Sequence, residues 1–239
     1  MEIELQRGKP LYALIADVHG SWIQFQAALN RLGFWREGGN WYSSGAFFVI
    51  SLGDLNDYRH DIGVDVSSSL NCMLTMKELQ EKGWGITVQS NHQDKLLRFL
   101  KGHEVKLTWG LDRTVAELTG HAPVDLGALS LWLESLPLFY EFEEDNIEYV
   151  AAHAYWSDRM GSNAKTDKSL AIYGPRNGAD RDKWWENYPK QKRIPIVGHY
   201  HESWLTATSI GIDDGCGEGG PLNIYIPSKG ETISIPFTM

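Results

Sequence analysis

The feature that most constrains the fold is the segment 50–58, where an apolar run ends abruptly in a glycine and two carboxylates. The run 46–52 leads directly into Gly53, Asp54 and Asp57. A buried strand that stops in this way presents acids at the edge of its sheet. Open α/β sheets place their functional sites at that edge. The segment therefore predicts an α/β fold with functional residues at strand ends.

Two other strand-like runs end in the same manner. The run 11–16 leads into Asp17 and His19, and the run 84–89 leads into Asn91 and His92. Asp17 and His19 are two residues apart, so on extended backbone both side chains would leave on the same side, as chelating ligands do. One such turn alone is most simply a helix cap or an acidic turn. Three together favour a functional site.

The first half of the chain alternates strands and helices. A serine cap and a glycine stop predict a helix over 21–33 with Trp22, Phe25, Leu29 and Leu32 on one face. Gly-Gly-Asn at 38–40 predicts a short hairpin. Helical patterns follow at 64–82, 93–101, 111–119 and 126–136. This βαβ alternation predicts a parallel sheet with right-handed crossovers.

The second half supplies more strands than helices. Short strand-like runs separated by turns lie at 138–142, 147–152, 194–197, 206–212, 222–226 and 232–236. The segment at about 157–193 has no clear periodicity, and a loop of that length usually has a function. We therefore expect a single domain over residues 1–239 with an inserted loop or lid at about 157–193.

The composition excludes several classes of protein. A net charge of -9 and a pI near 5.3 argue against non-specific coating of nucleic acid or binding of long duplexes. The sequence shows neither a signal-peptide pattern nor an apolar run of about 18 residues, so no membrane association is expected. With only two cysteines, neither a disulfide framework nor a thiolate metal cluster is indicated. We expect a reducing, cytoplasmic location.

Histidines at two later strand ends complete a set of candidate metal ligands. His153 follows the run 147–152, and His199 and His201 follow the run 194–197. The candidate ligands are Asp17, His19, Asp54, Asn91, His153, His199 and His201. All offer nitrogen or oxygen, which suits Mn²⁺, Fe or Zn²⁺. They are too many for one ion, and a shared Asp is typical of two-metal hydrolases.

The order of these motifs resembles the calcineurin-like metallophosphoesterases. It runs D-x-H, G-D-x-x-D, N-H, a lone H and G-H-x-H from Asp17 to His201. Segments 91–98, 111–114, 173–174 and 212–220 also resemble the phosphatase module of bacterial polynucleotide kinase-phosphatase, symmetrical dinucleoside tetraphosphatases and phage-type Ser/Thr phosphatases. No G-x-x-x-x-G-K-[ST] kinase motif is present. The resemblance implies a four-layer αββα fold, a double β-sandwich flanked by helices.

The same resemblance implies roles for the site residues. Asp17, His19 and His201 would hold one divalent ion, Asn91, His153 and His199 a second, and Asp54 would bridge them. Mn²⁺ is the first expectation, with Fe, Zn²⁺, Ni²⁺ or Co²⁺ as alternatives. His92 would protonate the leaving group as a general acid, and Asp57 would orient His92 and keep it charged.

The substrate-binding residues are harder to choose. The family's phosphate-binding arginine directly follows the second Asp of its motif, whereas here Tyr58 intervenes before Arg59. Arg59 is the first candidate, and the others are Lys95, Arg113, Arg159 and Arg176. Trp184 and Trp185 lie in a basic, aromatic segment, 181–193, that predicts either a nucleotide-stacking lid or a short helix whose tryptophans pack on the core. The Gly-rich segment 213–220 is read as a tight turn under the site, because no helix follows it.

The residues and the resemblance together predict a binuclear-metal phosphoesterase. We expect a nucleotidic substrate, either a dinucleoside polyphosphate or a phosphorylated nucleotide or strand end. A protein Ser/Thr phosphatase is the alternative within enzymes, because both reactions use the same ligands. A catalytically silent binding module with this fold is the alternative of another class.

Overall fold

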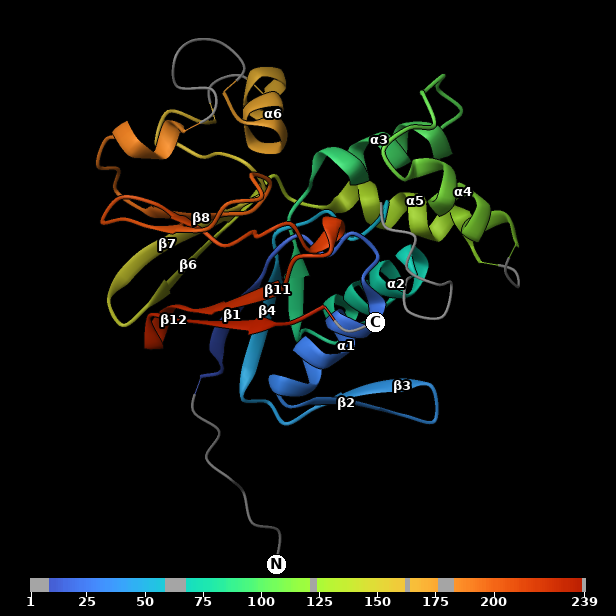
Figure 1. Ribbon diagram of the computed structural model, residues 1–239, viewed down its shortest axis with the longest axis horizontal. Helices are drawn as coiled ribbons and strands as arrows, with labels where there is room; N and C mark the ends of the chain where they lie inside the picture. The colour runs from blue at the N-terminus through green and yellow to red at the C-terminus, as the bar shows by residue number, and fades with distance from the viewer. Residues whose placement is uncertain (1–8, 59–67, 121–123, 162–163, 176–182, 238–239) are drawn as a thin grey trace, which may run out of the picture.

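Two five-stranded β-sheets form the centre of the computed structural model, which describes residues 9–58, 68–120, 124–161, 164–175 and 183–237 (Figure 1). The first sheet has the order β12-β11-β1-β4-β5. Its strands are β1 (Leu11–Ile15), β4 (Phe47–Ser51), β5 (Gly85–Thr87), β11 (Leu222–Ile226) and β12 (Glu231–Ile235). The second has the order β6-β7-β8-β10-β9. Its strands are β6 (Phe139–Glu144), β7 (Ile147–Ala152), β8 (Ile194–Val197), β9 (Trp204–Leu205) and β10 (Ile210–Gly211).

The predicted parallel strands lie together in the first sheet. β1 pairs in parallel with β4, and β4 pairs in parallel with β5. β11 joins the other side of β1 antiparallel and carries β12 with it, so the complete sheet is mixed. The apolar runs of β1 and β4 are buried because both faces of this sheet are covered.

Helices α1 (Trp22–Arg31) and α2 (Ser69–Glu81) pack on the first sheet. The predicted apolar face of α1 is buried, including Phe25, Leu29 and the following Leu32. Gly33, with φ 78°, ends this helix as predicted. The hairpin of β2 (Phe34–Glu37) and β3 (Asn40–Ser43) is also confirmed. Within the described ranges α2 starts at Ser69, where the Ser68 side chain accepts a hydrogen bond from the Asn71 N–H.

The second sheet packs face to face on the first. Along β7, Tyr149 and Ala151 belong to the main core, whereas Val150 and Ala152 belong to a separate cluster on the opposite face. Such alternation is expected of a strand with both faces covered by different layers. The Tyr12 and Phe142 rings, 4.5 Å apart, join the two sheets. This confirms the double β-sandwich flanked by helices.

The outer face of the second sheet is covered by the segment predicted to be an irregular loop. This segment contains α6 (Ala164–Tyr173) and a short 3-10 helix, η1 (Trp184–Asn187). The loop prediction was therefore wrong over these ranges. Periodicity failed because most apolar residues of α6 are consecutive, at 170–173, and only Ala171 and Ile172 of those are buried.

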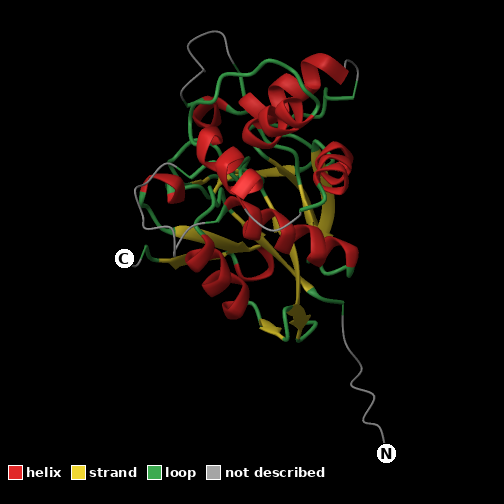
Figure 2. Ribbon diagram, turned by 90° about the vertical axis from the view of Figure 1, so that its right-hand side faces the viewer, coloured by secondary structure: helices red, strands yellow, loops and turns green. Residues whose placement is uncertain are grey.

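Three further helices gather on one side of the molecule, α3 (Asn91–Leu100), α4 (Leu111–Gly120) and α5 (Leu126–Ser135) (Figure 1). Figure 2 looks from that side and shows helices in front of the strands. Of the predicted strand 206–212, only Ile210–Gly211 (β10) is a strand, because Thr206 and Ser209 hydrogen-bond across a tight turn that joins β9 to β10. No helix in the ranges described has the length and apolar character needed to cross a membrane.

Candidate metal centre

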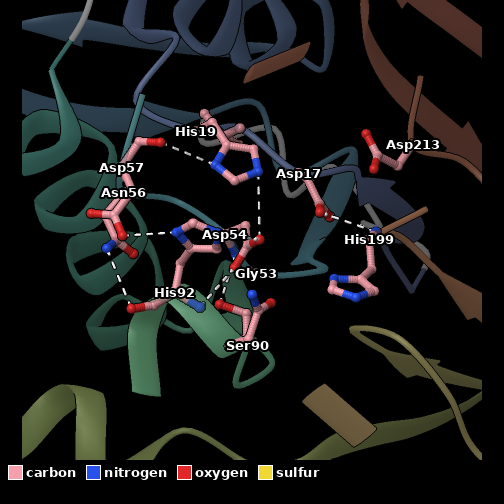
Figure 3. A network of polar contacts seen from close by, with 12 residues as sticks. Asp17, His19, Gly53, Asp54, Asn56, Asp57, Ser90, His92, His199 and Asp213 are labelled. Atoms are coloured by element: carbon pink, nitrogen blue, oxygen red, sulfur yellow. Dashed lines mark hydrogen bonds and ion pairs between the residues drawn. The ribbon is translucent and has the colours of Figure 1, made fainter. Parts of the chain in front are cut away.

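The candidate ligands follow strands of both sheets and lie in loops, except Asn91, which is the first residue of α3. Asp17, Asp54 and Asn91 follow β1, β4 and β5, whereas His153 and His199 follow β7 and β8. The loops are tied together by their backbones. Val18 N and His19 N both donate to Asp54 O, and Gly198 N donates to His153 O at 2.8 Å. Residues far apart in sequence therefore meet at one edge of the sandwich (Figure 3).

The backbone at this edge is left-handed rather than extended. The non-glycine residues with positive φ include His19 (45°), Asp54 (43°), Asp57 (70°), His199 (73°) and His201 (53°). The extended-strand explanation for the D-x-H and H-x-H spacings was therefore wrong, since β1 ends at Ile15 and β8 at Val197. Strained conformations of this kind cluster at functional sites, where the surrounding structure holds them.

Asp54 belongs to two groups of potential ligand atoms. Its Oδ2 lies 3.5 Å from His19 Nε2 and 3.9 Å from His92 Nε2. The same oxygen lies 3.6 Å from His153 Nε2, which in turn is 3.1 Å from His199 Nδ1. Within each group, the ligand atoms lie within 4.8 Å of one another. One buried carboxylate thus faces two neighbouring sets of imidazoles.

The environment of His153 fits a cation. Its Nδ1 lies 2.9 Å from Leu52 O, which can only accept, so Nδ1 carries the proton and Nε2 presents a lone pair. That lone pair lies 2.7 Å from Asn91 Oδ1 and 3.1 Å from His199 Nδ1. His153 Nε2 and Asn91 Oδ1 are acceptors, and His199 Nδ1 is a third in the tautomer that carries its proton on Nε2. A cation would satisfy all of them, as metal-ligating histidines are commonly held by a carbonyl behind the ring.

Asp17 is a second group that fits a cation. It is buried, its Oδ2 accepts from His199 N at 3.0 Å, and its Oδ1 has no hydrogen-bond partner within the described part of the chain. Burial raises the pKa of Asp17 well above its ordinary value, and the nearby charges of Asp213 and Asp54 raise it further. An added Cβ at Gly198 would lie 2.1 Å from Asp17 Oδ1, so glycine is required there.

Burial and neighbouring charges also shift the pKa values of Asp54, His199 and His153. Burial alone would raise the pKa of Asp54, but the charges of His153, His92 and His19 outweigh burial and the pKa is lowered. Burial, followed by the charge of His153, lowers the pKa of His199 to about 3. Burial likewise lowers the pKa of His153. The lowered pKa values favour an ionised Asp54 and unprotonated lone pairs on His153 and His199, which are the forms that bind divalent ions.

His201 lies apart from these groups. Its side chain is 37% exposed and its Nδ1 lies 3.5 Å from Glu218 Oε2. Its backbone N–H donates to Asp213 Oδ2. Neither set of ligand atoms found among the described residues contains His201, and its ligand role stays a prediction.

His92 and Asp57 form a buried pair beside the metal centre. His92 Nδ1 lies 2.7 Å from Asp57 Oδ2, while Asp57 Oδ1 accepts from Thr114 Oγ1 at 2.6 Å. Asp57 N donates to Thr114 Oγ1 and to Ser69 Oγ. The arrangement can hold and orient a proton on His92, as the sequence predicts.

Several supporting residues were missed from the sequence. Ser69 carries no motif. Thr114 lies in the segment 111–114 that resembles the phosphatase module, but nothing in that segment indicated a role for its hydroxyl. Asp213 was considered only as part of a turn, yet it is buried and contributes to the raised pKa of Asp17. The turn itself behaves as expected, because an added Cβ at Gly217 would lie 2.6 Å from His19 Cγ. Its glycines therefore permit close approach to the site.

The predicted substrate residues are scattered. Arg59 and Arg176 lie outside the described residues. The Arg113 guanidinium lies 5.3 Å from the centre of the Tyr58 ring, and Arg159 is exposed. Lys95 lines a pocket together with Asn91 and His92.

Trp184 and Trp185 require a correction. Only 4% and 5% of these residues are exposed, and both pack with Val150 and Val197 on the outer face of the second sheet. Trp185 also stacks on Trp204, with ring centres 3.8 Å apart. Buried rings cannot stack on a base, so the alternative prediction, packing on the core, describes them.

Comparison with known proteins extends over the whole chain. This chain is 29% identical over 242 residues to bis(5'-nucleosyl)-tetraphosphatase PrpE [asymmetrical] of Bacillus velezensis, and the match covers 95% of this chain and 93% of that protein. The protein of that name from Bacillus subtilis is 28% identical, with 95% of each chain covered. No family model matches the sequence.

Solved structures show the same fold. A crystal structure of a candidate diadenosine tetraphosphatase superposes with a TM-score of 0.66 at 18% identity, over 98% of this chain and 96% of that one. A yeast protein serine/threonine phosphatase with similarity to human PP5 gives 0.51 at 12% identity, over 97% and 81%. These likenesses concern the fold alone.

Proposed function

We propose that this chain, a calcineurin-like metallophosphoesterase, is a metal-dependent hydrolase that cleaves the phosphoanhydride chain of a dinucleoside polyphosphate. The observation that carries the proposal is the position of Asp54 between two sets of imidazoles. Such an arrangement is suited to a pair of divalent ions acting on one phosphoryl group. Because the chain carries this ligand set, we propose a hydrolase and not a catalytically silent binding module.

The ligand assignment is part of the proposal. Asp54 would bridge the ions, with the remaining ligands drawn from Asp17, His19, Asn91, His153, His199 and His201. Manganese is the proposed metal, and the nitrogen and oxygen ligands are compatible with it as they are with Fe or Zn²⁺. When bound, the ions supply positive charge for the phosphoryl oxygens and a nucleophilic hydroxide at neutral pH. His92 Nε2 lies 3.9 Å from Asp54 Oδ2, and a ligand role for His92 is therefore the alternative to proton transfer.

The proposed acid and its orienting residue act on the leaving group. Asp57 accepts a hydrogen bond from His92 Nδ1–H and would favour the charged imidazole, so that the Nε2 proton is available to the departing phosphate oxygen. Thr114 holds Asp57 in this orientation through two hydrogen bonds. All three residues are buried, so the pair is fixed before substrate binds.

The position of cleavage is proposed from the relatives. They are named asymmetrical tetraphosphatases, whereas the sequence motifs resemble the symmetrical enzymes among others. Asymmetric cleavage of a dinucleoside tetraphosphate yields one nucleoside triphosphate and one monophosphate, and symmetric cleavage yields two diphosphates. We propose the asymmetric reaction. A cytoplasmic location and a single domain remain predictions.

The test is product analysis of a substrate panel. Chelator-treated protein reloaded with Mn²⁺ is given a dinucleoside tetraphosphate, a strand-end phosphate and a phosphopeptide, and products are separated by ion-exchange chromatography. Equal amounts of mono- and triphosphate are expected, with Asp54→Asn as the inactive control. Faster turnover of the phosphopeptide would instead favour a protein phosphatase.

A further inference from the structure

A pocket of about 400 Å³ opens beside the His92 and Asp57 pair. Its walls come from the start of α3, from the segment 106–109 between α3 and α4, and from the last residue of α6. The residues used below are Asn91, His92, Lys95, Lys106, Trp109 and Tyr173. The volume falls within the roughly 300–1,000 Å³ typical of small-molecule sites. The pocket is large enough for a nucleotide fragment rather than a single phosphate.

Trp109 is the large exposed aromatic of this pocket. It is 64% exposed and has φ 64°, a conformation unusual for a bulky residue. The next residue, Gly110, packs on the backbone of the site, because an added Cβ would lie 2.6 Å from Asp57 C and 2.8 Å from Tyr58 O. The backbone that carries Trp109 is therefore anchored on the backbone of Asp57. A bulky residue that is held in an unfavourable backbone conformation and is exposed beside a site is typical of a functional residue.

Lysines accompany this ring in an otherwise acidic protein. Lys95 and Lys106 both line the pocket, while the chain carries a net charge of -9. Lys95 Nζ donates to Thr108 O at 2.7 Å and to Thr108 Oγ1 at 3.1 Å, which ties α3 to the segment that carries Trp109. An ion pair of 2.6 Å between Lys168 and Asp94 holds α6, and with it Tyr173, against α3.

We propose that this pocket binds the nucleoside part of the leaving fragment, with its base stacked on Trp109 and its phosphates near Lys95 and Lys106. The assignment to the leaving fragment follows from His92, which lines the pocket and donates its proton to that fragment, and so rests on the proposed function. A flat aromatic surface next to two cations matches the two chemical parts of a nucleotide. A phosphopeptide would need no exposed indole.

The test compares two inhibitors that differ only by a nucleoside. Adenosine triphosphate and inorganic tripolyphosphate are titrated as competitive inhibitors of p-nitrophenyl phosphate hydrolysis, with Mn²⁺ in excess. Trp109→Asn removes the ring, and Asn tolerates left-handed backbone. The Ki of adenosine triphosphate should rise roughly five- to hundred-fold, the range expected for one lost base stack, with no change for tripolyphosphate.

Matched variants separate stacking from other effects. Trp109→Phe should keep the Ki of adenosine triphosphate within about threefold, because a phenyl ring still stacks. Lys106→Ala should raise the Ki of both inhibitors. Trp35→Ala, which removes a tryptophan that is 45% exposed on β2, should change neither. An unchanged Ki for adenosine triphosphate in Trp109→Asn would overturn the proposal.

A second measurement needs no variant. Photolabelling of the native protein with 8-azidoadenosine triphosphate should modify the peptide containing residues 106–109, and labelling confined to other peptides would overturn the proposal. Because the reporter is p-nitrophenyl phosphate, the outcome does not depend on dinucleotide hydrolysis. Absence of dinucleoside tetraphosphate turnover would contradict the proposed function, whereas an indifferent Trp109 would contradict only the pocket assignment.

Discussion

His92 Nδ1 and Asp57 Oδ2 lie 2.7 Å apart, with both side chains buried. Because the carboxylate accepts the hydrogen bond, the Nδ1 proton is fixed and Nε2 is the atom left to act. Nε2 faces Asp54 Oδ2 at 3.9 Å. The orientation of this imidazole would therefore place the proposed general acid next to the candidate metal centre.

Replacing His92 by Ala should slow substrates according to their leaving groups. A general acid contributes roughly 10²–10⁴-fold when the leaving group is poor. The loss of kcat should be in that range for a nucleotide substrate and far smaller for p-nitrophenyl phosphate, whose leaving group needs no proton. Asp57→Asn should show the same selectivity in weaker form.

Metal content distinguishes this role from ligation by His92. Elemental analysis of His92→Ala should find as much metal as in the unaltered protein. Equal losses on both substrates together with lost metal would make His92 a ligand, as its place in one of the two donor groups allows.

Thr114 should affect the reaction through its hydrogen bonds to Asp57. Its hydroxyl donates to Asp57 Oδ1 and accepts from Asp57 N, so Thr114→Val leaves two buried groups without this partner. We expect a loss of roughly 1–3 kcal/mol in the free energy of unfolding. The kcat for nucleotide should fall more than that for p-nitrophenyl phosphate. Thr114→Ser, which keeps the hydroxyl, should restore both, and denaturant titration with steady-state kinetics measures them.

The positions of the candidate ligands at strand ends could be predicted, because an apolar run that ends in polar residues is visible in the sequence. Asp17, Asp54 and His153 were chosen in this way, and all three are buried. The left-handed backbone at His19 and His199 could not be, since it depends on contacts with other loops, such as the bond from His19 N to Asp54 O. The direction of the His201 side chain, which turns toward Glu218, depends in the same way on contacts between loops.

Removing metal should abolish activity, and replacing Asp54 should reduce activity more than replacing any other proposed ligand. Asp54 faces both sets of imidazoles, so Asp54→Asn is expected to lower metal content from two ions per chain and to abolish turnover. Asn91→Ala should affect one ion only. Inductively coupled plasma analysis and activity after Mn²⁺ reloading check this. Full activity in the presence of chelator would contradict a metal-dependent reaction.

Asp17 should make the metal-free protein less stable as pH rises. Its pKa is raised by burial and by Asp213 and Asp54, so the folded state holds the proton above the pH at which the unfolded state releases it. Its contribution to stability is therefore complete below the ordinary Asp pKa and is lost as pH rises through the folded-state pKa.

Asp17→Asn removes that buried charge. The chelator-treated variant should melt a few degrees above the unaltered protein near pH 8, with the difference shrinking toward pH 5; about 1 kcal/mol corresponds to roughly 2–4 °C in a chain of this size. With Mn²⁺ the order should reverse, because the variant lacks a ligand. Calorimetry with and without chelator measures both, and a lower melting temperature for the metal-free variant would contradict the expectation.

Burial distinguishes the two predictions made for Trp184 and Trp185, a nucleotide-stacking lid and packing on the core. A segment with interleaved aromatic and basic residues suits both a lid and a helix packed on a sheet, and the sequence alone left both open. The outward-facing Val150, Ala152 and Val197 of the second sheet need cover, and Trp184 and Trp185 supply it. No motif in the sequence marked Trp109, and its role is inferred from its exposure and from the packing of the adjacent Gly110 on the Asp57 backbone.

Trp184→Ala should therefore destabilise the protein without altering nucleotide recognition. Truncating a buried aromatic costs about 3–5 kcal/mol, and Trp184 packs against Tyr155, Tyr188 and Trp204. The denaturant midpoint should fall, while the Ki of adenosine triphosphate at a temperature where the variant is folded should match that of the unaltered protein. Trp109→Asn should show the opposite pair of results. A raised Ki with an unchanged midpoint in Trp184→Ala would restore the stacking role that burial argues against.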